Sequence, residues 1–283
     1  MKVGIIGAGV VGKATGIGLK TRGHEVCYVD KNPSVIVHLR ENGFAVEESI
    51  DRAVSSSDLV MIAVPTPTVN GCISLTAILE SITHIGVALG QAQGYKLVTI
   101  RSTVLPTTTR TAVIPLIEAL SGKRAGADFG VCVNPEFLRA ATALDDFLLP
   151  DRIVIGELDQ RSGQTLESLY ESFHRPILRC SLEEAELAKY AANGFLATKI
   201  SYFNEIHKLA RRLDINPQVV SLAVSMDKRI GAYGTEGGRP FDGNCLPKDT
   251  EAFLRRAEEL GENLQVLGAA RRVNKEIVLE KHA

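Results

Sequence analysis

A cysteine near the C-terminus, Cys245, stands in a setting that suits nucleophilic chemistry. Pro247 follows it by two residues, and proline is favoured in the first turn of a helix because its missing N–H would be unpaired there. The sequence therefore predicts a helix that starts beside Cys245 and continues through Leu254. The helix dipole and the charge of Lys248 both favour the thiolate, which is the nucleophilic form. A buried, unreactive thiol at a helix start is the alternative for a single cysteine.

Three polar residues stand at spacings that place side chains on one face of a helix. Asp249 follows Cys245 by four residues and shares its face if the turn is helical. Lys189 and Asn193 are also four residues apart, in a segment with a helical pattern. Long helices commonly carry solvated lysines, so a non-functional, exposed Lys189 is the alternative.

The N-terminal residues carry the fingerprint of a dinucleotide site. The apolar strand Lys2–Ile6 leads into Gly7, Gly9 and Gly12, and a helical pattern follows. In such a loop the first glycine permits a tight turn, the second lets the backbone approach a pyrophosphate, and the third lets helix and strand pack closely. A second strand ends at Asp30, whose carboxylate accepts hydrogen bonds from ribose hydroxyls and repels a 2′-phosphate. The sequence predicts an NAD site, with a glycine-rich turn that binds no ligand as the alternative.

Further apolar strands alternate with helices, as in a doubly wound parallel sheet. We expect strands at 58–64, 96–100, 129–133 and 152–155, and helices at 75–89 and 108–120. Ligands bind beyond the carboxyl ends of such strands, where polar loops follow at 64–67, 101–103 and 134–138. Ordinary turn chemistry is the alternative for any one of these loops.

The pattern from Ser181 onward is helical. Ser181 and Glu184 form a capping box, which predicts the start of a helix that runs to Leu213. Pro217 opens another helix, through Met226, and a glycine-rich loop at 234–243 then leads to Cys245. We therefore expect a dinucleotide-binding domain at 1–180 and a helical domain at 181–283.

The composition indicates a globular protein and excludes several partners. The 283 residues include 32 basic and 33 acidic side chains, so no basic stripe predicts nucleic acid and no polybasic block predicts a membrane surface. No apolar run reaches the ~18 residues that span a bilayer. The five cysteines lack metal-ligand spacing, and their odd number, with no secretory leader, predicts reduced thiols in the cytoplasm.

Taken together, these segments resemble the UDP-glucose/GDP-mannose 6-dehydrogenase family from end to end. The shared pieces are Gly7-x-Gly9-x-x-Gly12, Val64-Pro-Thr-Pro67, Ser102-Thr103-Val104, Asn134-Pro-Glu-Phe-Leu138, Pro150-Asp-Arg-Ile-Val-Ile-Gly156, Lys189-Tyr-Ala-Ala-Asn193, Arg229-Ile-Gly231 and Gly243-x-Cys245-Leu-Pro-Lys-Asp249. The resemblance implies a Rossmann-type sheet followed by a helical central domain that forms a homodimer. It also implies a cytoplasmic enzyme that oxidises the CH₂OH group of a nucleotide sugar to a carboxylate in two NAD-dependent steps.

The resemblance further implies roles for individual residues. Cys245 attacks the aldehyde intermediate to form a thiohemiacetal, whose oxidation gives a thioester that water hydrolyses. Lys189 and Asn193 stabilise oxyanions, and Asp249 positions a water that acts as base. Glu136 assists hydrolysis of the thioester.

Binding residues follow from the same motifs. The implied cofactor-binding residues are Gly7, Gly9, Val11, Gly12, Asp30, Thr66, Thr103 and Lys248, with Thr103 beside the nicotinamide and the catalytic water. The implied substrate-binding residues are Phe137, Leu138, Lys189, Asn193, Arg229, Phe241 and Gly243, with Arg229 reaching the sugar site of the partner subunit. No metal is implied.

The chain departs from the family pattern at several positions. Family members commonly read Asn-Pro-Glu-Phe-Leu-x-Glu-Gly, whereas this chain has Ala140 in place of the second glutamate. Asp242 replaces a glycine close to Cys245, where its charge would raise the pKa of the thiol, and Thr107 replaces a common glycine. Family enzymes also carry a third, nucleotide-binding domain, whereas this chain stops at Ala283. The alternatives are a fragment, a naturally short dehydrogenase of a different alcohol, and a cofactor-binding dimerisation module without turnover.

Overall fold

The computed structural model describes residues 1–282, with side chains described for residues 1–279. The chain forms two compact units, the first containing residues 1–66 and 74–189 and the second containing residues 67–73 and the chain from 190 onward. The first turns of the long helix α8 thus belong with the first unit, and a short segment at 67–73 belongs with the second. The domain boundary expected at 180/181 stays a prediction.

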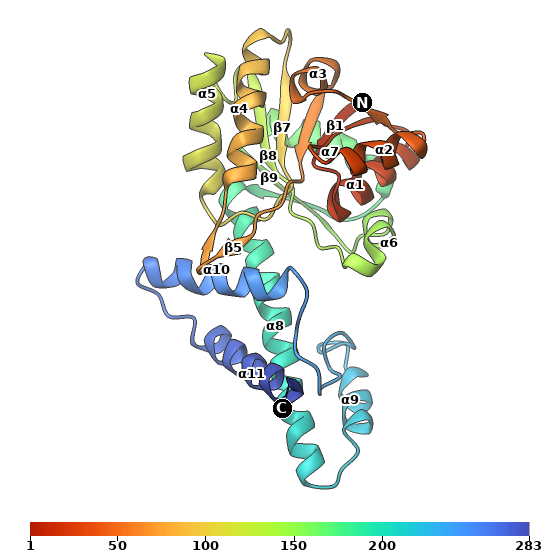
Figure 1. Ribbon diagram of the computed structural model, residues 1–283, viewed down its shortest axis with the longest axis vertical. Coiled ribbons are helices and arrows are strands. Elements are labelled where there is room, and N and C mark those ends of the chain that lie inside the picture. Colours follow the sequence, from red (N-terminus) through yellow and green to blue (C-terminus); the bar gives the residue numbers. More distant parts are fainter. Residues whose placement is uncertain (283) are drawn as a thin grey trace. The chain divides into compact units, whose positions relative to one another are not determined.

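The first unit is built on an eight-stranded sheet with the order β10-β9-β8-β7-β4-β1-β2-β3 (Figure 1). The strands are β1 (Lys2–Ile6), β2 (Glu25–Val29), β3 (Ala45–Val46), β4 (Leu59–Ile62), β7 (Lys96–Ile100), β8 (Phe129–Val133), β9 (Ile153–Glu157) and β10 (Ile177–Ser181). The strands from β3 to β8 along this order are parallel. The predicted α/β class with a Rossmann-like, mostly parallel sheet is therefore confirmed.

Helices cover both faces of this sheet, which makes it doubly wound. They are α1 (Val10–Thr21), α2 (Pro33–Glu41), α3 (Ile50–Ser56), α4 (Thr76–Gln91), α5 (Ile114–Ser121), α6 (Ala143–Leu148) and α7 (Gln160–Tyr170), with short turns η2 (Ala140–Thr142) and η3 (Glu171–Phe173). One core joins α3, α4 and α5 to the sheet, and a second core joins α1, α2, α6 and α7 to it. Each face thus buries its own set of apolar side chains.

The last two strands differ from the expected parallel arrangement. β9 pairs with β8 in antiparallel register, with Val133 opposite Gly156, and β10 then runs parallel to β9. The chain between β8 and β9 contains only the short helix α6 and a 3₁₀ turn, whereas a parallel connection needs a crossover that returns the chain to the opposite edge. The expectation of a parallel strand at 152–155 was wrong for this reason.

A π-helical turn, η1 (Thr109–Val113), replaces the first part of the helix expected at 108–120. Pro115 follows it in the first turn of α5, and proline has no N–H for the regular helical ladder. Such π turns are commonly associated with functional sites.

The second unit is helical apart from one hairpin. Its elements are the continuation of α8 (Leu182–Arg212), α9 (Pro217–Ser225), α10 (Leu246–Glu259), α11 (Gln265–His282), β5 (Thr68–Val69) and β6 (Cys72–Ile73). The capping box at the start of α8 is confirmed, because the Glu184 N–H donates to Ser181 Oγ and the Ser181 N–H donates to the Glu184 carboxylate. The β5–β6 hairpin, which the sequence did not predict, contacts α10.

Candidate active site

The three glycines of the loop between β1 and α1 differ in how much space surrounds them. Gly7 has a φ of +92°, and a Cβ there would lie 2.6 Å from the Ala63 carbonyl oxygen. At Gly12 a Cβ would lie 1.9 Å from the Gly7 carbonyl oxygen. Gly9 differs from both. Apart from its chain neighbours and the backbone of its own helix, no atom of the described residues would lie within 4 Å of a Cβ there. The loop is therefore tightly packed at Gly7 and Gly12 and open at Gly9.

Asp30 at the end of β2 ties this loop to the second strand. Its carboxylate accepts hydrogen bonds from the Ala8 N–H at 2.7 Å and from the Asn32 N–H at 2.8 Å. Each carboxylate oxygen has further lone pairs, so this geometry leaves Asp30 able to accept from a ribose hydroxyl.

These residues fit a bound dinucleotide. Gly9 is the N-cap of α1, and within residues 1–279 no side chain caps the first N–H groups of that helix. Uncapped N–H groups and the helix dipole favour a phosphate group at this position, and the open space at Gly9 lets a phosphate approach the backbone. Val10 is half exposed, and Val11 is partly buried in the first turn of the same helix.

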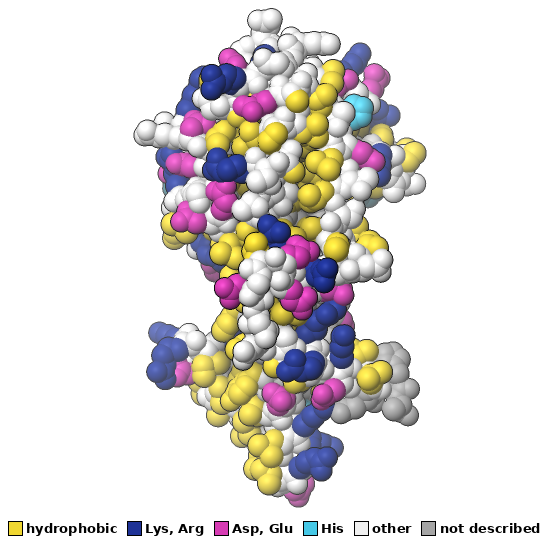
Figure 2. Space-filling model, turned by 90° about the vertical axis from the view of Figure 1, so that its left-hand side faces the viewer, with side chains coloured by type: hydrophobic (Ala, Val, Ile, Leu, Met, Phe, Trp, Pro, Cys, Tyr) yellow, Lys and Arg dark blue, Asp and Glu magenta, His cyan; other side chains and the backbone are white. Residues whose placement is uncertain are grey.

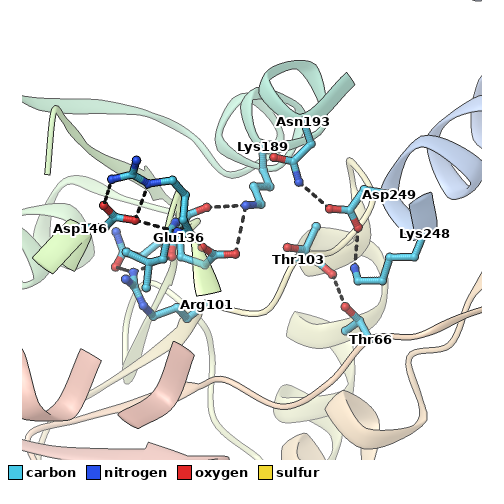
Figure 3. A network of polar contacts seen from close by, with 12 residues as sticks. Thr66, Arg101, Thr103, Glu136, Asp146, Lys189, Asn193, Lys248 and Asp249 are labelled. Carbon is cyan, nitrogen blue, oxygen red and sulfur yellow. Dashed lines mark hydrogen bonds and ion pairs between the residues drawn. The ribbon is translucent and has the colours of Figure 1, made fainter. Parts of the chain in front are cut away.

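Two loops that follow neighbouring strands of the sheet are joined by hydrogen bonds. The Thr66 hydroxyl, after β4, donates to the Thr103 carbonyl, after β7, at 2.8 Å (Figure 3). Ser102 donates its hydroxyl to the Val64 carbonyl at 2.7 Å. Thr66 and Thr103, both predicted to lie at the cofactor, are thus brought together within the first unit.

A buried arginine, which the sequence did not single out, organises the floor of this region. Arg101 is 4% exposed; its Nε donates to the Thr15 hydroxyl in α1, and a terminal nitrogen donates to Asn134 Oδ1 at 2.6 Å. The Tyr170 hydroxyl donates to the same Asn134 oxygen. This network links α1 with the ends of β7 and β8, and Arg101 also adds positive charge near Glu136.

Glu136 and Lys189 form a buried ion pair. The Lys189 ammonium, from α8, donates to the Glu136 carboxylate at 3.0 Å and to the Glu136 carbonyl at 2.6 Å (Figure 3). Both side chains are less than a tenth exposed. Burial alone raises the pKa of Glu136, but the Lys189 charge, the Leu138 N–H and the Arg101 charge together hold it below its usual value. Lys189 is therefore not the exposed, solvated lysine that the sequence left open.

The loop after Glu136 is also fixed by charged side chains. The guanidinium of Arg152 lies 3.8 Å from the ring centre of Phe137. Arg139 pairs with Asp146, and this hydrogen bond holds the pKa of Asp146 at about 2. Asp146 is thus paired with Arg139, and it does not replace the carboxylate that is missing at Ala140.

The second unit places Cys245 at the start of α10, as predicted. Cys245 is the N-cap residue and is exposed, and the Asp249 N–H donates to its carbonyl at 2.9 Å, which closes the expected helical turn. Asp249 is 2% exposed and accepts hydrogen bonds from Asn193 Nδ2 at 2.6 Å and from the Lys248 ammonium (Figure 3). Lys248 is thus paired with Asp249, which offsets the charge expected to act on the thiol.

The loop that precedes Cys245 is held by two buried asparagines that sequence reasoning missed. Asn204, in α8, accepts from the Gly238 and Arg239 N–H groups and donates to the Arg239 carbonyl. Asn274, in α11, accepts from the Phe241 N–H at 2.7 Å and donates to the Phe241 carbonyl at 3.0 Å. Phe241 is 4% exposed, so its ring lies in the core of the second unit, whereas Gly243 sits at a φ of +76°.

Arg229 stands apart from these buried groups. Its side chain is 89% exposed and pairs with Asp227, two residues before it. The backbone of this motif is anchored by Lys199, whose ammonium donates to the carbonyls of Ile230 and Gly231.

Comparison with known proteins agrees with this fold. Residues 37–174 match the UDP-glucose/GDP-mannose dehydrogenase family, NAD binding domain, and residues 183–276 match the central domain of the same family. A GDP-mannose 6-dehydrogenase of Pseudomonas syringae pv. tomato is 38% identical over 97% of this chain and 68% of its own length. A UDP-glucose 6-dehydrogenase of Haloferax volcanii is 33% identical over 97% of this chain and 69% of its own length. The structure of a UDP-glucose dehydrogenase from Pyrobaculum islandicum superposes with a TM-score of 0.90 at 36% identity, over 97% of this chain and 68% of that one.

The fold and the site define an NAD-dependent oxidoreductase. The chain belongs to the UDP-glucose/GDP-mannose dehydrogenase family, whose members are NAD-dependent nucleotide-sugar dehydrogenases. Its cofactor is NAD, as the glycine loop and Asp30 predicted. Along residues 1–282, no helix combines the length and the apolarity that a membrane span requires.

The buried ion pair predicts a stability change that depends on both partners. Lys189→Met leaves the Glu136 carboxylate buried without its cation, which typically costs about 3–5 kcal/mol. Adding Glu136→Gln should recover part of this loss. Urea unfolding at pH 7 measures the free energies, and an equal loss in the single and double variants would contradict the pairing.

The same pair predicts a dependence on pH. The pKa of Glu136 is lowered by folding, so its charge stabilises the folded state above the unfolded pKa of about 4.3, and this stabilisation is lost as the pH falls through the folded value. The wild-type chain should therefore lose more stability between pH 7 and pH 4 than Glu136→Gln. Glu80→Gln, at an exposed position of α4, is the control and should follow the wild type.

Asp30 predicts the preference for NAD over NADP. Asp30→Asn keeps an acceptor for the Ala8 N–H but removes the charge, so NADP should gain affinity relative to NAD by roughly tenfold, or about 1.4 kcal/mol. Asp30→Ala also removes the acceptor and should weaken NAD binding outright. Calorimetric titration of both dinucleotides measures the two constants. Tighter binding of NADP than of NAD to the unmutated chain would overturn this assignment.

Proposed function

We propose that this chain oxidises the CH₂OH group of a nucleotide sugar of the UDP-glucose type to the uronic acid in two steps, through a covalent adduct on Cys245. The observation that carries the proposal is the exposed Cys245 thiol at the start of α10, one turn before the buried Asp249. Asp249 in turn holds Asn193, so the nucleophile, a carboxylate and an amide donor are organised within one unit.

The covalent step explains why a cysteine is needed. When bound, NAD accepts the hydride in each oxidation. An aldehyde cannot lose a hydride until a nucleophile adds to its carbon, and the Cys245 thiolate supplies that group by forming a C–S bond. Loss of a hydride and a proton from this thiohemiacetal leaves a thioester. Attack by water then breaks the C–S bond and releases the carboxylate with the thiolate regenerated.

The polar residues have donors left for this chemistry. The contacts to Glu136 use two of the three ammonium N–H groups of Lys189, and the contact to Asp249 uses one of the two amide N–H groups of Asn193. Each residue thus keeps a donor for an oxyanion on the reacting carbon. Because Lys189 and Asn193 are one turn apart on α8, the helix fixes their spacing.

Two carboxylates take the remaining roles in this proposal. Asp249 orients the water that receives the hydroxyl proton, with Thr103 as a second contact of that water. Glu136, which the Lys189 charge keeps ionised, assists the water that hydrolyses the thioester. Phe137, Leu138, Phe241 and Gly243 belong to the loops that we propose contact the sugar, and Lys248 belongs to the cofactor side.

Replacing the nucleophile tests the proposal. The wild-type chain should form two NADH per carboxylate on a panel of UDP-glucose, GDP-mannose and simple alcohols. Cys245→Ala should lower carboxylate formation by roughly a thousandfold or more. Cys72→Ala removes another exposed thiol of the second unit and should change nothing.

Each other outcome points to a different function. Full carboxylate production by Cys245→Ala would refute the covalent mechanism. One NADH per aldehyde, with no carboxylate, would indicate a one-step dehydrogenase of another alcohol. No NADH with any alcohol, despite NAD binding, would indicate a binding module without turnover.

We also propose that the second unit forms a homodimer, in which Arg229 reaches the sugar site of the partner subunit. Exposed apolar side chains recur along one face of α8, at Phe195, Tyr202 and Leu209, and Leu213 follows directly after the helix; each is more than half exposed. The heptad spacing of the first three is typical of a helix seam. Val219 and Leu222 on α9 and Met226 at its C-terminal end are exposed in the same way. Figure 2 shows further apolar side chains gathered along one edge of the lower part of the molecule.

The other apolar side chains of α8 differ in their exposure. Leu187 is exposed, whereas Leu196, Ile200 and Ile206 are partly buried. Phe195→Glu combined with Leu209→Glu should convert a dimer into a monomer in light scattering at micromolar concentration. Arg211→Glu places the same charge on the opposite face of α8 and should leave the dimer intact. A monomeric wild-type chain would refute the proposal.

A further inference from the structure

A buried carboxylate on α8, Glu186, has no role in the reaction described above. Its side chain is 1% exposed, and its two oxygens accept hydrogen bonds from the Thr107 N–H at 2.6 Å and the Thr109 N–H at 2.9 Å. Burial raises the pKa of Glu186, and hydrogen bonding from Thr109 and Thr107 opposes that rise. The backbone N–H groups of Thr107 and Thr109 thus hold this buried carboxylate in place.

The backbone that Glu186 holds is strained. Thr107 has a φ of +80°, in the left-handed region where a β-branched residue is rare. Such a conformation is unfavourable for a β-branched residue and persists only where surrounding contacts enforce it. In this conformation the N–H groups of Thr107 and Thr109 both point to one carboxylate, at the start of the π-helical turn η1. The carboxylate and the strained turn therefore stabilise each other.

This turn ends the loop that carries Thr103. The loop follows β7, and its beginning is fixed to β4, because Ser102 donates its N–H to the Ile62 carbonyl and its hydroxyl to the Val64 carbonyl. Glu186 fixes its other end four residues after Thr103. The position of Thr103 thus depends on two anchors, one from the sheet and one from α8.

We propose that Glu186 is a positioning residue, which holds Thr107 in its left-handed conformation and thereby keeps Thr103 where the reaction requires it. This inference rests on the proposed function, in which Thr103 contacts the catalytic water beside the nicotinamide. Glu186 and Lys189 are three residues apart and share a face of α8, so one turn of this helix fixes the loop after β7 and the loop after β8.

Replacing Glu186 by glutamine tests the anchoring with little change of shape. A glutamine has the same shape as Glu186, but it offers one acceptor oxygen and turns an NH₂ group toward the other backbone N–H. Glu186→Gln therefore removes one anchor without opening a cavity. Thr107→Gly adopts a positive φ without strain, so it should make the loop less dependent on the carboxylate.

The experiment combines hydrogen exchange with kinetics on the full chain. The variants are Glu186→Gln, Thr107→Gly and the double variant. Glu205→Gln is the control, because Glu205 is exposed on the same helix and lies in the second unit, away from the measured segment in sequence. Amide exchange of residues 101–110 is measured by mass spectrometry with and without NAD, beside kcat and KM for the nucleotide sugar.

The proposal predicts a specific pattern. Glu186→Gln should speed exchange in residues 101–110 about tenfold, reduce its protection by NAD, and lower kcat about tenfold with a smaller change in KM. Thr107→Gly should recover part of both losses in the double variant, and Glu205→Gln should behave as the wild type. Unchanged exchange in Glu186→Gln would overturn the proposal, and so would faster exchange with an unchanged kcat, which would reduce Glu186 to a purely structural role.

The exchange measurement also separates this inference from the proposed function. If the wild-type chain shows no turnover, the proposed function fails. The effect of Glu186→Gln on exchange in the presence of NAD still decides the inference: a lost protection supports the anchoring of the cofactor loop, and a retained protection refutes it.

Discussion

The loops that carry the polar groups of both units are anchored by side chains of a single helix, α8. Four of its residues hydrogen-bond to such loops: Glu186 to Thr107 and Thr109, Lys189 to Glu136, Lys199 to Ile230 and Gly231, and Asn204 to Gly238 and Arg239. A fifth, Asn193, binds Asp249 in the first turn of α10. A helix rises ~1.5 Å per residue, so within the first unit it fixes the spacing of Glu186 and Lys189, which lie one turn apart. The helix belongs at its start to the first unit and afterwards to the second.

Burying the polar side chains that make these contacts carries a large cost in desolvation free energy. Glu136, Glu186, Lys189, Asn193 and Asp249 are all less than a tenth exposed. Removing charged groups from water costs several kcal/mol per ion, and a pair recovers this only with good geometry and additional hydrogen bonds. Apolar side chains would pack the same positions with less cost. Buried polar groups gathered on loops after parallel strands, and around an exposed thiol, are the pattern expected of a reaction site.

Two buried carboxylates near the start of α8 illustrate how environment decides charge. Glu136 faces an ammonium group from Lys189 and lies near Arg101, so its pKa is lowered despite burial. Glu186 accepts hydrogen bonds from the backbone N–H groups of Thr107 and Thr109, and burial outweighs them, so its pKa is raised. Backbone dipoles orient a carboxylate well but compensate less of its lost hydration than a full charge does. The first carboxylate thus suits chemistry that needs an anion, and the second suits anchoring of a backbone turn.

The sequence by itself determined the local features of this protein. The three glycines with the strand before them and Asp30 after them predicted the cofactor loop, because Gly7 and Gly12 meet backbone requirements that no other residue meets and Gly9 leaves the helix start open. The strands Lys96–Ile100 and Phe129–Val133 are as predicted, since continuous apolar runs fit strands buried on both faces. Ser181 and Pro247 predicted the starts of α8 and α10 through their own hydrogen-bonding chemistry. A family resemblance spread over the whole chain added the chemistry.

Only the tertiary structure decided which distant residues meet. The spacing of Lys189 and Asn193 placed them on one helix face, but nothing in it specifies that they bind Glu136 and Asp249, which lie 53 and 56 residues away. Glu186 shares that face and was overlooked, because its partners are backbone N–H groups, which leave no trace in side-chain patterns. The antiparallel β8–β9 pairing and the β5–β6 hairpin on α10 were missed for a related reason. Local periodicity reports which side of an element is buried, whereas strand direction and loop anchoring are settled by the packing of segments far apart in the chain.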